Sequence, residues 1–447
     1  MGDELSRRRF LEVAGAGISA SALPSLTSAA EGDTRPNIIF IMADDLGAEC
    51  LGCYGGQDYD TPRLDGLART GLQFDNAYCT PLCTPTRVEV MTGQYPCHNG
   101  WPAGIWTKPR EKQFLDPDMF NFAHLLQNAG YATAVAGKWQ LARFEDRPHH
   151  ARNIGFDEHC LWTWLYSKAP DSIRMEGRNK PSRFWGPGMW RNGSLMEDTK
   201  GKFGPDICAD FLIDFIEKHR SDPFFVYYPM NLTHWPFVPV PGMEGDKDGT
   251  RKGKTAKRNF GAMVEYTDMI VGRIADKLDE LGIRENTLLI FTGDNGTAKD
   301  IRSKYKGSML RGGKHDLTDA GARVPFIVDW PGQTPQGEVV DDLIDFSDML
   351  PTFADASGAS IPSDHKVDGR SILPQIRGRK GKPRDWVFCQ RGGGWFLRSK
   401  NWRLRSNGQF VRMAGHYSPK EVDTEKNAEA ARAKKRLQKV ARSLGVM

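Results

Sequence analysis

The chain contains the run Cys83-Thr84-Pro85-Thr86-Arg87-Val88-Glu89-Val90-Met91-Thr92-Gly93. Pro85 disfavours helical geometry at Thr84 and suits the first turn of a helix, so a helix is expected with Cys83 just before its N-terminus. Arg87 would lie one helical turn further, on the same face. In this electropositive position a cysteine is predicted to have a lowered pKa or to bind anions. A buried cysteine that only precedes a helix fits the pentapeptide equally well.

The whole eleven-residue run resembles the signature of the type I sulfatases. That signature is a cysteine, any residue, proline or alanine, serine or threonine, and arginine, followed by a hydrophobic residue and Thr-Gly, and every fixed position is filled here. In that family the cysteine is oxidised to Cα-formylglycine. The resemblance implies that Cys83 is modified in this way and that Arg87 steadies the aldehyde hydrate. One hydroxyl of the hydrate would attack the sulfur of a sulfate ester, and the other would then expel sulfate.

Acidic residues follow two apolar runs of strand length. Residues 37–42 lead to Asp44 and Asp45, and residues 287–292 lead to Asp294 and Asn295. Adjacent carboxylates after a buried strand need a positive partner, and ligands of α/β sheets collect at such strand ends, although a solvated turn is the simpler alternative. Three carboxylates and an amide favour Ca²⁺ or Mg²⁺ over zinc. The resemblance implies Ca²⁺, with the hydrate at Cys83 also bound to the metal, and the ion would polarise a sulfate oxygen.

A third apolar run, residues 131–136, leads into Gly137-Lys138-Trp139-Gln140-Leu141. This is similar to the family's Gly-Lys-Trp-His-Leu, so Lys138 is expected to hold the hydrate and the sulfate. Gln140 departs from the family pattern, in which the histidine takes the proton when sulfate is expelled. An amide cannot serve as that base, although Gln140 would still donate a hydrogen bond to the hydrate.

Two further segments supply candidate sulfate ligands. His234 follows the apolar run 224–228 and precedes Trp235-Pro236, a setting that resembles the family's sulfate-binding histidine, although a lone histidine there is more often structural. Lys314 precedes residues 319–328, which resemble the family's last catalytic segment, so it is expected to bind sulfate and stabilise the leaving oxygen. His315 stands where glycine is common in the family. It is the nearest residue in the sequence that could perform the proton transfer that Gln140 cannot perform.

Between Cys160 and Leu195 the chain is irregular and rich in aromatic residues and arginine. Sugar rings stack on indoles and arginines hold sulfates, so this insertion would suit a surface that faces substrate, but packing of a long loop explains it at least as well. The residues concerned are Trp162, Trp164, Tyr166, Arg174, Arg178, Lys180, Arg183, Trp185, Trp190 and Arg191.

Residues 1–30 predict a Tat export signal. Twin arginines in Ser6-Arg7-Arg8-Arg9-Phe10-Leu11 precede a weakly apolar stretch and Ser28-Ala29-Ala30, which resembles a signal-peptide cleavage site. The alternative interpretation of this segment is the basic start of a helix. The expected partners are therefore the Tat machinery and a formylglycine-generating maturase, and the expected location is the bacterial periplasm or the exterior. No later apolar run is long enough to span a bilayer.

The number of cysteines and the distribution of charge argue against a disulfide-rich protein, a zinc protein and a nucleic-acid binding protein. Eight cysteines are too few for a disulfide framework, although Cys50, Cys53, Cys79 and Cys97 would allow a disulfide, and Cys50 and Cys53 lack the partners of a zinc motif. The formal net charge of +5 is accounted for by the tail, residues 425–447, and no nucleic-acid module accompanies it.

The secondary-structure pattern predicts helices at 115–127, 206–219, 259–281 and 345–356, the last kinked by Pro351. Short antiparallel strands are expected at 386–389, 395–398 and 401–405. A closing helix with Ala430, Leu437 and Leu444 on one face ends at Gly445.

The resemblance covers residues 34–410 and implies the α/β fold of the alkaline-phosphatase-like proteins. A large domain, 34–365, would hold a mainly parallel sheet between helices, and a smaller subdomain, 366–447, would hold an antiparallel sheet and a basic terminal helix. The predicted function is hydrolysis of sulfate esters, on a sulfated carbohydrate or an aryl sulfate. The alternatives are a phosphodiester or phosphonate monoester hydrolase of the same fold, and a sulfated-glycan binding protein without turnover.

Overall fold

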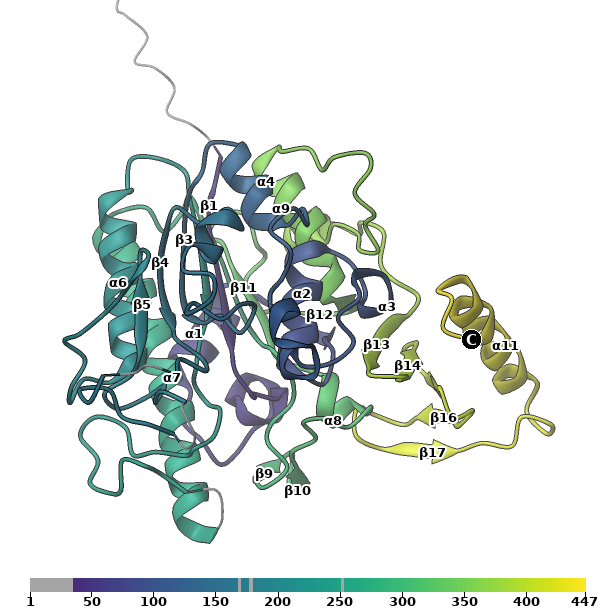
Figure 1. Cartoon of the computed structure of the whole chain (residues 1–447). Helices are drawn as coiled ribbons and strands as arrows, with labels where there is room; N and C mark the ends of the chain where they lie inside the picture. The colour runs from purple at the N-terminus through teal and green to yellow at the C-terminus, as the bar shows by residue number, and fades with distance from the viewer. Residues whose placement is uncertain (1–34, 168–169, 177–179, 251–252) are drawn as a thin grey trace, which may run out of the picture. The chain divides into compact units, whose positions relative to one another are not determined.

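A ten-stranded sheet dominates the computed structural model, which describes residues 35–167, 170–176, 180–250 and 253–447 (Figure 1). The predicted export signal lies outside these residues. The strand order is β12-β2-β11-β8-β1-β7-β3-β4-β5-β6. The strands are β1 Asn37–Ala43, β2 Leu72–Tyr78, β3 Ala132–Lys138, β4 Glu158–Trp162, β5 Met189–Arg191, β6 Ser194–Leu195, β7 Phe224–Pro229, β8 Thr287–Gly293, β11 Phe326–Asp329 and β12 Glu338–Asp345.

The centre of this sheet is parallel. Strand β1 pairs in parallel with β8 and β7, which places Ile39 opposite Leu289 on one side and Val226 on the other, and β3 pairs in parallel with β7 and β4. Strand β11 runs antiparallel to β8 and β2, and the edge strands β5 and β6 are also antiparallel. The expected mainly parallel sheet is confirmed, and the carboxyl ends of its parallel strands share one edge.

Helices cover both faces of the sheet, which explains why β1 is a continuous apolar run buried along its whole length. Helices α1 Pro62–Thr70, α6 Gly204–Lys218 and α7 Gly253–Glu280 lie on one face, and α2 Cys83–Thr92, α4 Phe122–Asn128 and α9 Met349–Ser357 lie on the other (Figure 1). On the second face the Phe40 ring contacts the rings of Phe122, Tyr227 and Phe353. This aromatic cluster fixes α4 and α9 against the sheet.

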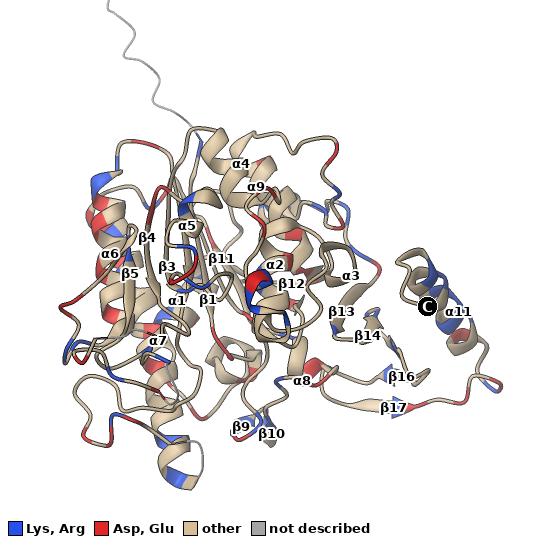
Figure 2. Ribbon diagram, in the orientation of Figure 1, with Lys and Arg blue, Asp and Glu red and all other residues tan. Residues whose placement is uncertain are grey.

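A separate five-stranded antiparallel sheet follows near the C-terminus, with the order β13-β14-β15-β16-β17. Its strands are β13 Val387–Arg391, β14 Gly394–Arg398, β15 Trp402–Arg405, β16 Phe410–Met413 and β17 Pro419–Glu421. Helix α11, Ala428–Ser443, packs on β14 and β15 through Ala430, Leu437 and Ala441, and carries several lysines and arginines (Figure 2). This sheet and helix were expected. The boundary at residue 365 stays a prediction, since Arg35–Met447 form one compact unit.

Three helix predictions are wrong in their bounds. The helix expected at 115–127 is limited to α4, because Asn121 is extended and caps it by accepting from the Ala123 N–H at 2.8 Å. Helix α7 begins at Gly253, six residues earlier than expected. The helix expected at 345–356 is the short turn η5, Phe346–Asp348, followed by α9, and Pro351 falls in the first turn of α9, where proline does not kink a helix.

The remaining elements are short. They are η1 Ala48–Cys50, η2 Gly52–Tyr54, α3 Pro96–Asn99, η3 Ile105–Thr107, η4 Arg110–Lys112, α5 His150–Asn153, β9 Arg302–Tyr305, β10 Ser308–Arg311, α8 Asp319–Ala322 and α10 Leu373–Ile376. No helix among the described residues is both long and apolar enough for a membrane crossing. All eight cysteines, which lie in the described part of the chain, are free, so none of the four near the signature is paired.

The aromatic insertion extends the main sheet through β4, β5 and β6. The indoles of Trp162, Trp164, Trp185 and Trp190 are all buried, so these four residues pack the insertion against the fold. The packing interpretation therefore holds for the tryptophans. The basic residues of the insertion are considered with the site below.

Candidate active site

The candidate site lies at the carboxyl ends of four neighbouring parallel strands. Asp44 and Asp45 follow β1, Lys138 ends β3, His234 follows β7, and Asp294 and Asn295 follow β8. Glycines allow the close approach of these strand ends. At Gly137 a Cβ atom would collide with the carbonyl oxygen of Pro229, and the φ angle of 115° is one that other residues rarely adopt. The sheet thus brings together residues that lie far apart in the sequence.

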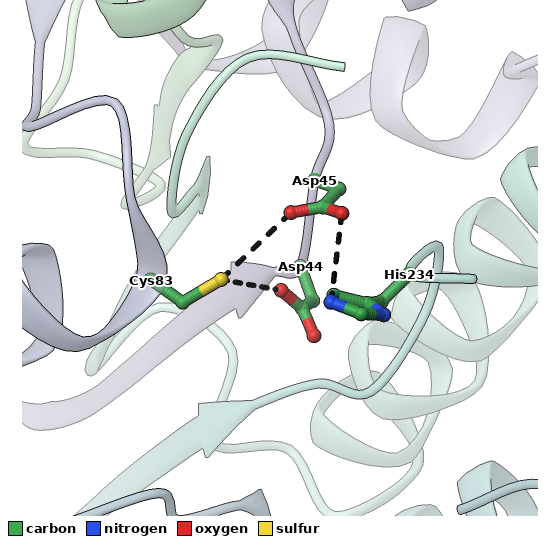
Figure 3. A group of neighbouring side chains, drawn as sticks. All are labelled: Asp44, Asp45, Cys83 and His234. Carbon is green, nitrogen blue, oxygen red and sulfur yellow. Dashed lines mark hydrogen bonds and ion pairs between the residues drawn. The ribbon is translucent and has the colours of Figure 1, made fainter. Parts of the chain in front are cut away.

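Cys83 is the first residue of α2 and faces both carboxylates that follow β1 (Figure 3). Its sulfur lies 3.4 Å from Asp44 Oδ1 and 3.8 Å from Asp45 Oδ1. The prediction of a lowered thiol pKa is wrong: burial raises the pKa of Cys83, and Asp294 adds to the rise beyond what Lys138 offsets. As an unmodified thiol, Cys83 is therefore protonated and a poor nucleophile.

Each of the three carboxylates has a different cation at hydrogen-bond distance. Lys138 Nζ lies 2.7 Å from Asp44 Oδ2, Lys314 Nζ lies 2.7 Å from Asp45 Oδ2, and the Arg87 guanidinium lies 2.7 Å from Asp294 Oδ2. All six side chains are buried. Arg87 also donates to the carbonyl oxygen of Lys138 at 2.9 Å, which ties the helix of the cysteine to the end of β3.

These pairs set the protonation of the carboxylates. Burial alone would raise the pKa of Asp44, but the Lys138 ammonium and the Arg87 guanidinium outweigh it and hold this pKa at about 2. Burial and the neighbouring Asp44 raise the pKa of Asp294 to about 6 despite Arg87. The carboxylates of Asp44 and Asp294 are thus ionised at neutral pH.

The remaining polar atoms fit a cation. The Asn295 amide donates to Asp45 Oδ1 at 2.8 Å and to the carbonyl oxygen of Gly296, and its own Oδ1 is buried without a hydrogen-bond partner among the described residues. Candidate ligand atoms of Asp44, Asp45, Cys83 and His234 all lie within 4.8 Å of one another (Figure 3). An orphaned amide oxygen beside buried carboxylates suits a hard divalent ion.

His234 presents a lone pair to the same place. Its Nδ1 lies 2.6 Å from the carbonyl oxygen of Trp235, which only accepts, so Nδ1 carries the proton. Burial, followed by Lys314 and Arg183, lowers the pKa of His234 well below its usual value, so the ring is neutral. Its Nε2 therefore faces Asp45 Oδ2 at 3.8 Å with both atoms acceptors, an arrangement that a positive group between them would stabilise.

The structure also shows the surroundings of Gln140 and His315, the two residues that depart from the family pattern. Gln140 is buried, has a φ of 53°, and its Oε1 has no hydrogen-bond partner among the described residues. His315 is partly exposed and its backbone is fixed, since its N–H donates to Pro81 and its carbonyl accepts from Arg391. Partial burial and Lys314 lower the pKa of His315 to about 4, so its imidazole is neutral and able to accept a proton.

Arg183 is the residue that sequence reasoning did not single out. It was named only with the other basic residues of the insertion, yet its side chain is 2% exposed and it adds to the lowering of the pKa of both Asp44 and His234. The only feature of the sequence that could have indicated a role for Arg183 is its position among aromatic residues. Sequence alone could not distinguish it from Arg191, which is exposed.

A buried cysteine between carboxylates, with lysines and an arginine around them at the end of a parallel sheet, is suited to the hydrolysis of anionic esters. The family model for sulfatases matches residues 36–359. The steryl-sulfatase of Mus musculus is 28% identical over 86% of this chain and 71% of its own length. The N-acetylgalactosamine-6-O-sulfatase of Bacteroides thetaiotaomicron is 29% identical over 80% of this chain and 79% of its own length.

The fold is also similar to that of solved sulfatases. A sulfatase from a Pseudoalteromonas species has a TM-score of 0.70 and 23% identity, with 92% of this chain and 90% of that chain covered. The chain belongs to the sulfatase family. Its reaction is accordingly the hydrolysis of sulfate esters, and the resemblance noted at Cys83 is confirmed.

Proposed function

We propose that the protein hydrolyses sulfate esters of carbohydrates with Cys83 converted to Cα-formylglycine by a maturase. The observation that carries this proposal is the position of Cys83, which touches both Asp44 and Asp45 while its thiol has a raised pKa. A protonated thiol is a poor nucleophile, whereas the hydrate of an aldehyde at this position supplies a hydroxyl for attack on sulfur and a second one to release sulfate.

Asp44, Asp45, Asp294 and Asn295 would hold a divalent ion, Ca²⁺ in preference to Mg²⁺. The support is the orphaned Asn295 oxygen and the buried carboxylates of Asp44 and Asp45, which belong to the group of candidate ligands within 4.8 Å of one another. Such an ion supplies a Lewis acid that polarises a sulfate oxygen. His234 Nε2 and the two lysine ammoniums would then be available to orient the sulfate.

The cations around Cys83 have separate tasks. Lys138 and Lys314 each lie one carboxylate away from the sulfur of Cys83, so both would bind sulfate oxygens, and Lys314 would stabilise charge on the leaving oxygen. Arg87 is held by Asp294 and by the backbone of Lys138, and so steadies the residue one turn before it. Gln140, with its unpaired oxygen, would bind a hydroxyl at Cys83.

The proton released at the end of turnover would go to His315. Its neutral imidazole follows Lys314 directly, and its backbone is held at both N–H and C=O. Water is the alternative acceptor. The substrate class is proposed from the relatives that act on N-acetylgalactosamine sulfate, while aryl sulfates remain suitable probes.

We also propose Tat export to the periplasm or beyond, on the twin arginines of residues 1–30. N-terminal sequencing of protein recovered from the periplasm of a Tat-competent host tests this proposal. Cleavage near Ala30 is expected, and an intact N-terminus in the cytoplasm would contradict it.

The test of the chemistry is peptide mass spectrometry across Cys83 on protein made with a formylglycine-generating maturase, combined with rates on an aryl sulfate and an aryl phosphodiester. The proposal expects an aldehyde at residue 83 and a faster rate on the sulfate. An unmodified thiol in protein that releases sulfate would refute the modification. A faster rate on the phosphodiester would favour the phosphodiesterase alternative, and an aldehyde without any turnover would favour the binding protein.

A further inference from the structure

Two basic residues of the insertion lie beside the proposed sulfate position and are not used by the reaction described above. Arg183 stacks on the Trp162 ring, with 4.3 Å between its guanidinium carbon and the ring centroid. Lys180 Nζ lies 5.3 Å from the centroid of Trp162 and 5.1 Å from that of Trp235, the residue next to His234. These two residues thus lie on the Trp235 side of the site.

Arg183 and Lys180 share a single carboxylate. Glu176 accepts from the Arg183 backbone N–H at 2.8 Å and from Arg183 Nε at 3.2 Å, and its Oε2 lies 3.3 Å from Lys180 Nζ. One terminal nitrogen of Arg183 is buried and has no hydrogen-bond partner among the described residues. Two cations with one carboxylate leave a positive charge and a buried donor without a partner, which is costly unless a ligand completes the pair.

This surplus charge lies near the catalytic site, since Lys180 Nζ is 5.1 Å from the ring centroid of Trp235, the residue that follows His234. Burial and nearer groups dominate the pKa values of Asp44 and His234, and Arg183 adds a further lowering to both. The three cations around Cys83 are already matched by three carboxylates, whereas the pair in the insertion is not. An anion next to the scissile sulfate would therefore find its counter-charge in the insertion.

A pocket is available for the body of the substrate. It has a volume of about 270 Å³ and is lined in part by Met175, Glu176, Ser182, Trp235, Lys247 and Asp248. Glu176 connects the pocket to Arg183 and Lys180, and Trp235 connects it to His234. An aromatic wall beside charged groups is suited to a sugar ring that carries an anionic substituent.

We propose that Arg183 and Lys180 bind a second oxyanion of the substrate, a carboxylate or a further sulfate placed beside the sulfate that is hydrolysed. The inference rests on the proposed function, because it assigns the substrate to the class of sulfated sugars that carry a second negative group. A guanidinium with a free terminal nitrogen binds carboxylate and sulfate oxygens alike. Burial and the neighbouring Arg183 lower the pKa of Lys180 to about 7, and a bound anion would keep its ammonium protonated.

The first experiment is independent of turnover. Crystals of the wild-type protein with Ca²⁺ are soaked in selenate, whose anomalous signal locates each bound anion. We expect one selenate beside Cys83 and a second between Arg183 and Lys180. The Arg183→Met variant is expected to keep the first and lose the second, and Arg183→Lys to keep both.

Arg191→Met is the matched control. Arg191 belongs to the same insertion but is exposed and stacks on Phe211, so its loss should leave both selenates in place. Absence of the second selenate from the wild type, or its persistence in Arg183→Met, would overturn the inference. Because each variant is seen in its own crystal, a folding defect is recognised directly.

The second experiment compares two substrates that differ only in a second anionic group, such as mono- and disulfated forms of one sugar. Arg183→Met should lower kcat/KM by about tenfold more for the doubly anionic form, through KM and not kcat. An equal loss on both would show that Arg183 serves the scissile sulfate and would overturn the inference. If neither form releases sulfate although both selenates are bound, the proposed function fails and the second anion position stands.

Discussion

The buried carboxyl group of Glu89 should make the free energy of unfolding depend on pH in a measurable way. Glu89 lies in α2, is fully buried, and neither carboxyl oxygen has a hydrogen-bond partner among the described residues. The cation that faces it, Arg384, already donates to Asp348 at 2.7 Å and to the Tyr95 hydroxyl at 2.7 Å. Burial, with Asp345 adding to it, raises the pKa of Glu89 well above its usual value. The folded protein therefore keeps Glu89 protonated where the unfolded chain releases the proton.

The sign and size of the effect follow from this difference. Because the folded pKa is the higher one, the stabilisation is complete below the unfolded pKa of about 4.5 and is lost as the pH rises toward the folded pKa. The loss is about 1.4 kcal/mol per pH unit. Glutamine cannot titrate, so the stability of Glu89→Gln relative to wild type should rise with pH from pH 5.5 upward, by up to about 1.4 kcal/mol per pH unit until the folded pKa of Glu89 is reached.

Urea denaturation at pH 5.5, 6.5 and 7.5 measures this difference in the free energy of unfolding. Asp345, whose pKa burial raises to about 6, titrates in the same range, so the comparison with wild type at each pH is needed to isolate Glu89. The control is Glu285→Gln, a change at an exposed glutamate, which should leave the pH dependence of wild type intact. A constant difference between Glu89→Gln and wild type across the three pH values would refute the reasoning.

Three further outcomes are expected. Arg87→Met removes the partner of the buried Asp294 carboxylate and should cost about 3–5 kcal/mol of unfolding free energy; a loss below about 1 kcal/mol in urea denaturation would contradict this. Removal of divalent ions with a chelator should abolish sulfate release, with Ca²⁺ or Mg²⁺ restoring it better than Zn²⁺, and full activity of metal-free protein would count against the metal site. His315→Ala should lower kcat by about a hundredfold and remove the loss of activity expected below pH 4, where the imidazole charges; an unchanged pH profile would exclude this proton acceptor.

The parts of the fold that depend on the spacing of apolar residues and on their burial could be predicted from the sequence. The apolar runs that became β1, β3, β7 and β8 are continuous because helices cover both faces, and the polar residues after them meet because parallel strands end at one edge. This argument placed Asp44, Asp45, Lys138, His234, Asp294 and Asn295 together. The start of α4 was missed because the Asn121 side-chain cap decides it, and the first turns of α7 were missed because they are polar apart from the buried Ala256.

Electrostatic properties of the site were harder to predict. The helix position of Cys83 indicated a lowered pKa, but burial and the carboxylates around the sulfur dominate and reverse the sign. Arg183 and Arg191 look alike in the sequence of the insertion, and only the fold decides that one is buried beside the site and the other is exposed. Such differences depend on tertiary placement, which local patterns do not contain.

The most direct measurement is sulfate release by wild-type protein and by Cys83→Ala, both produced with the maturase and assayed with Ca²⁺ on the same sulfated sugar and aryl sulfate substrates. The account predicts sulfate from the wild type and none from the variant, with both proteins equally folded. Equal release by both proteins, or no release by wild-type protein whose residue 83 is shown to be the aldehyde, would contradict it.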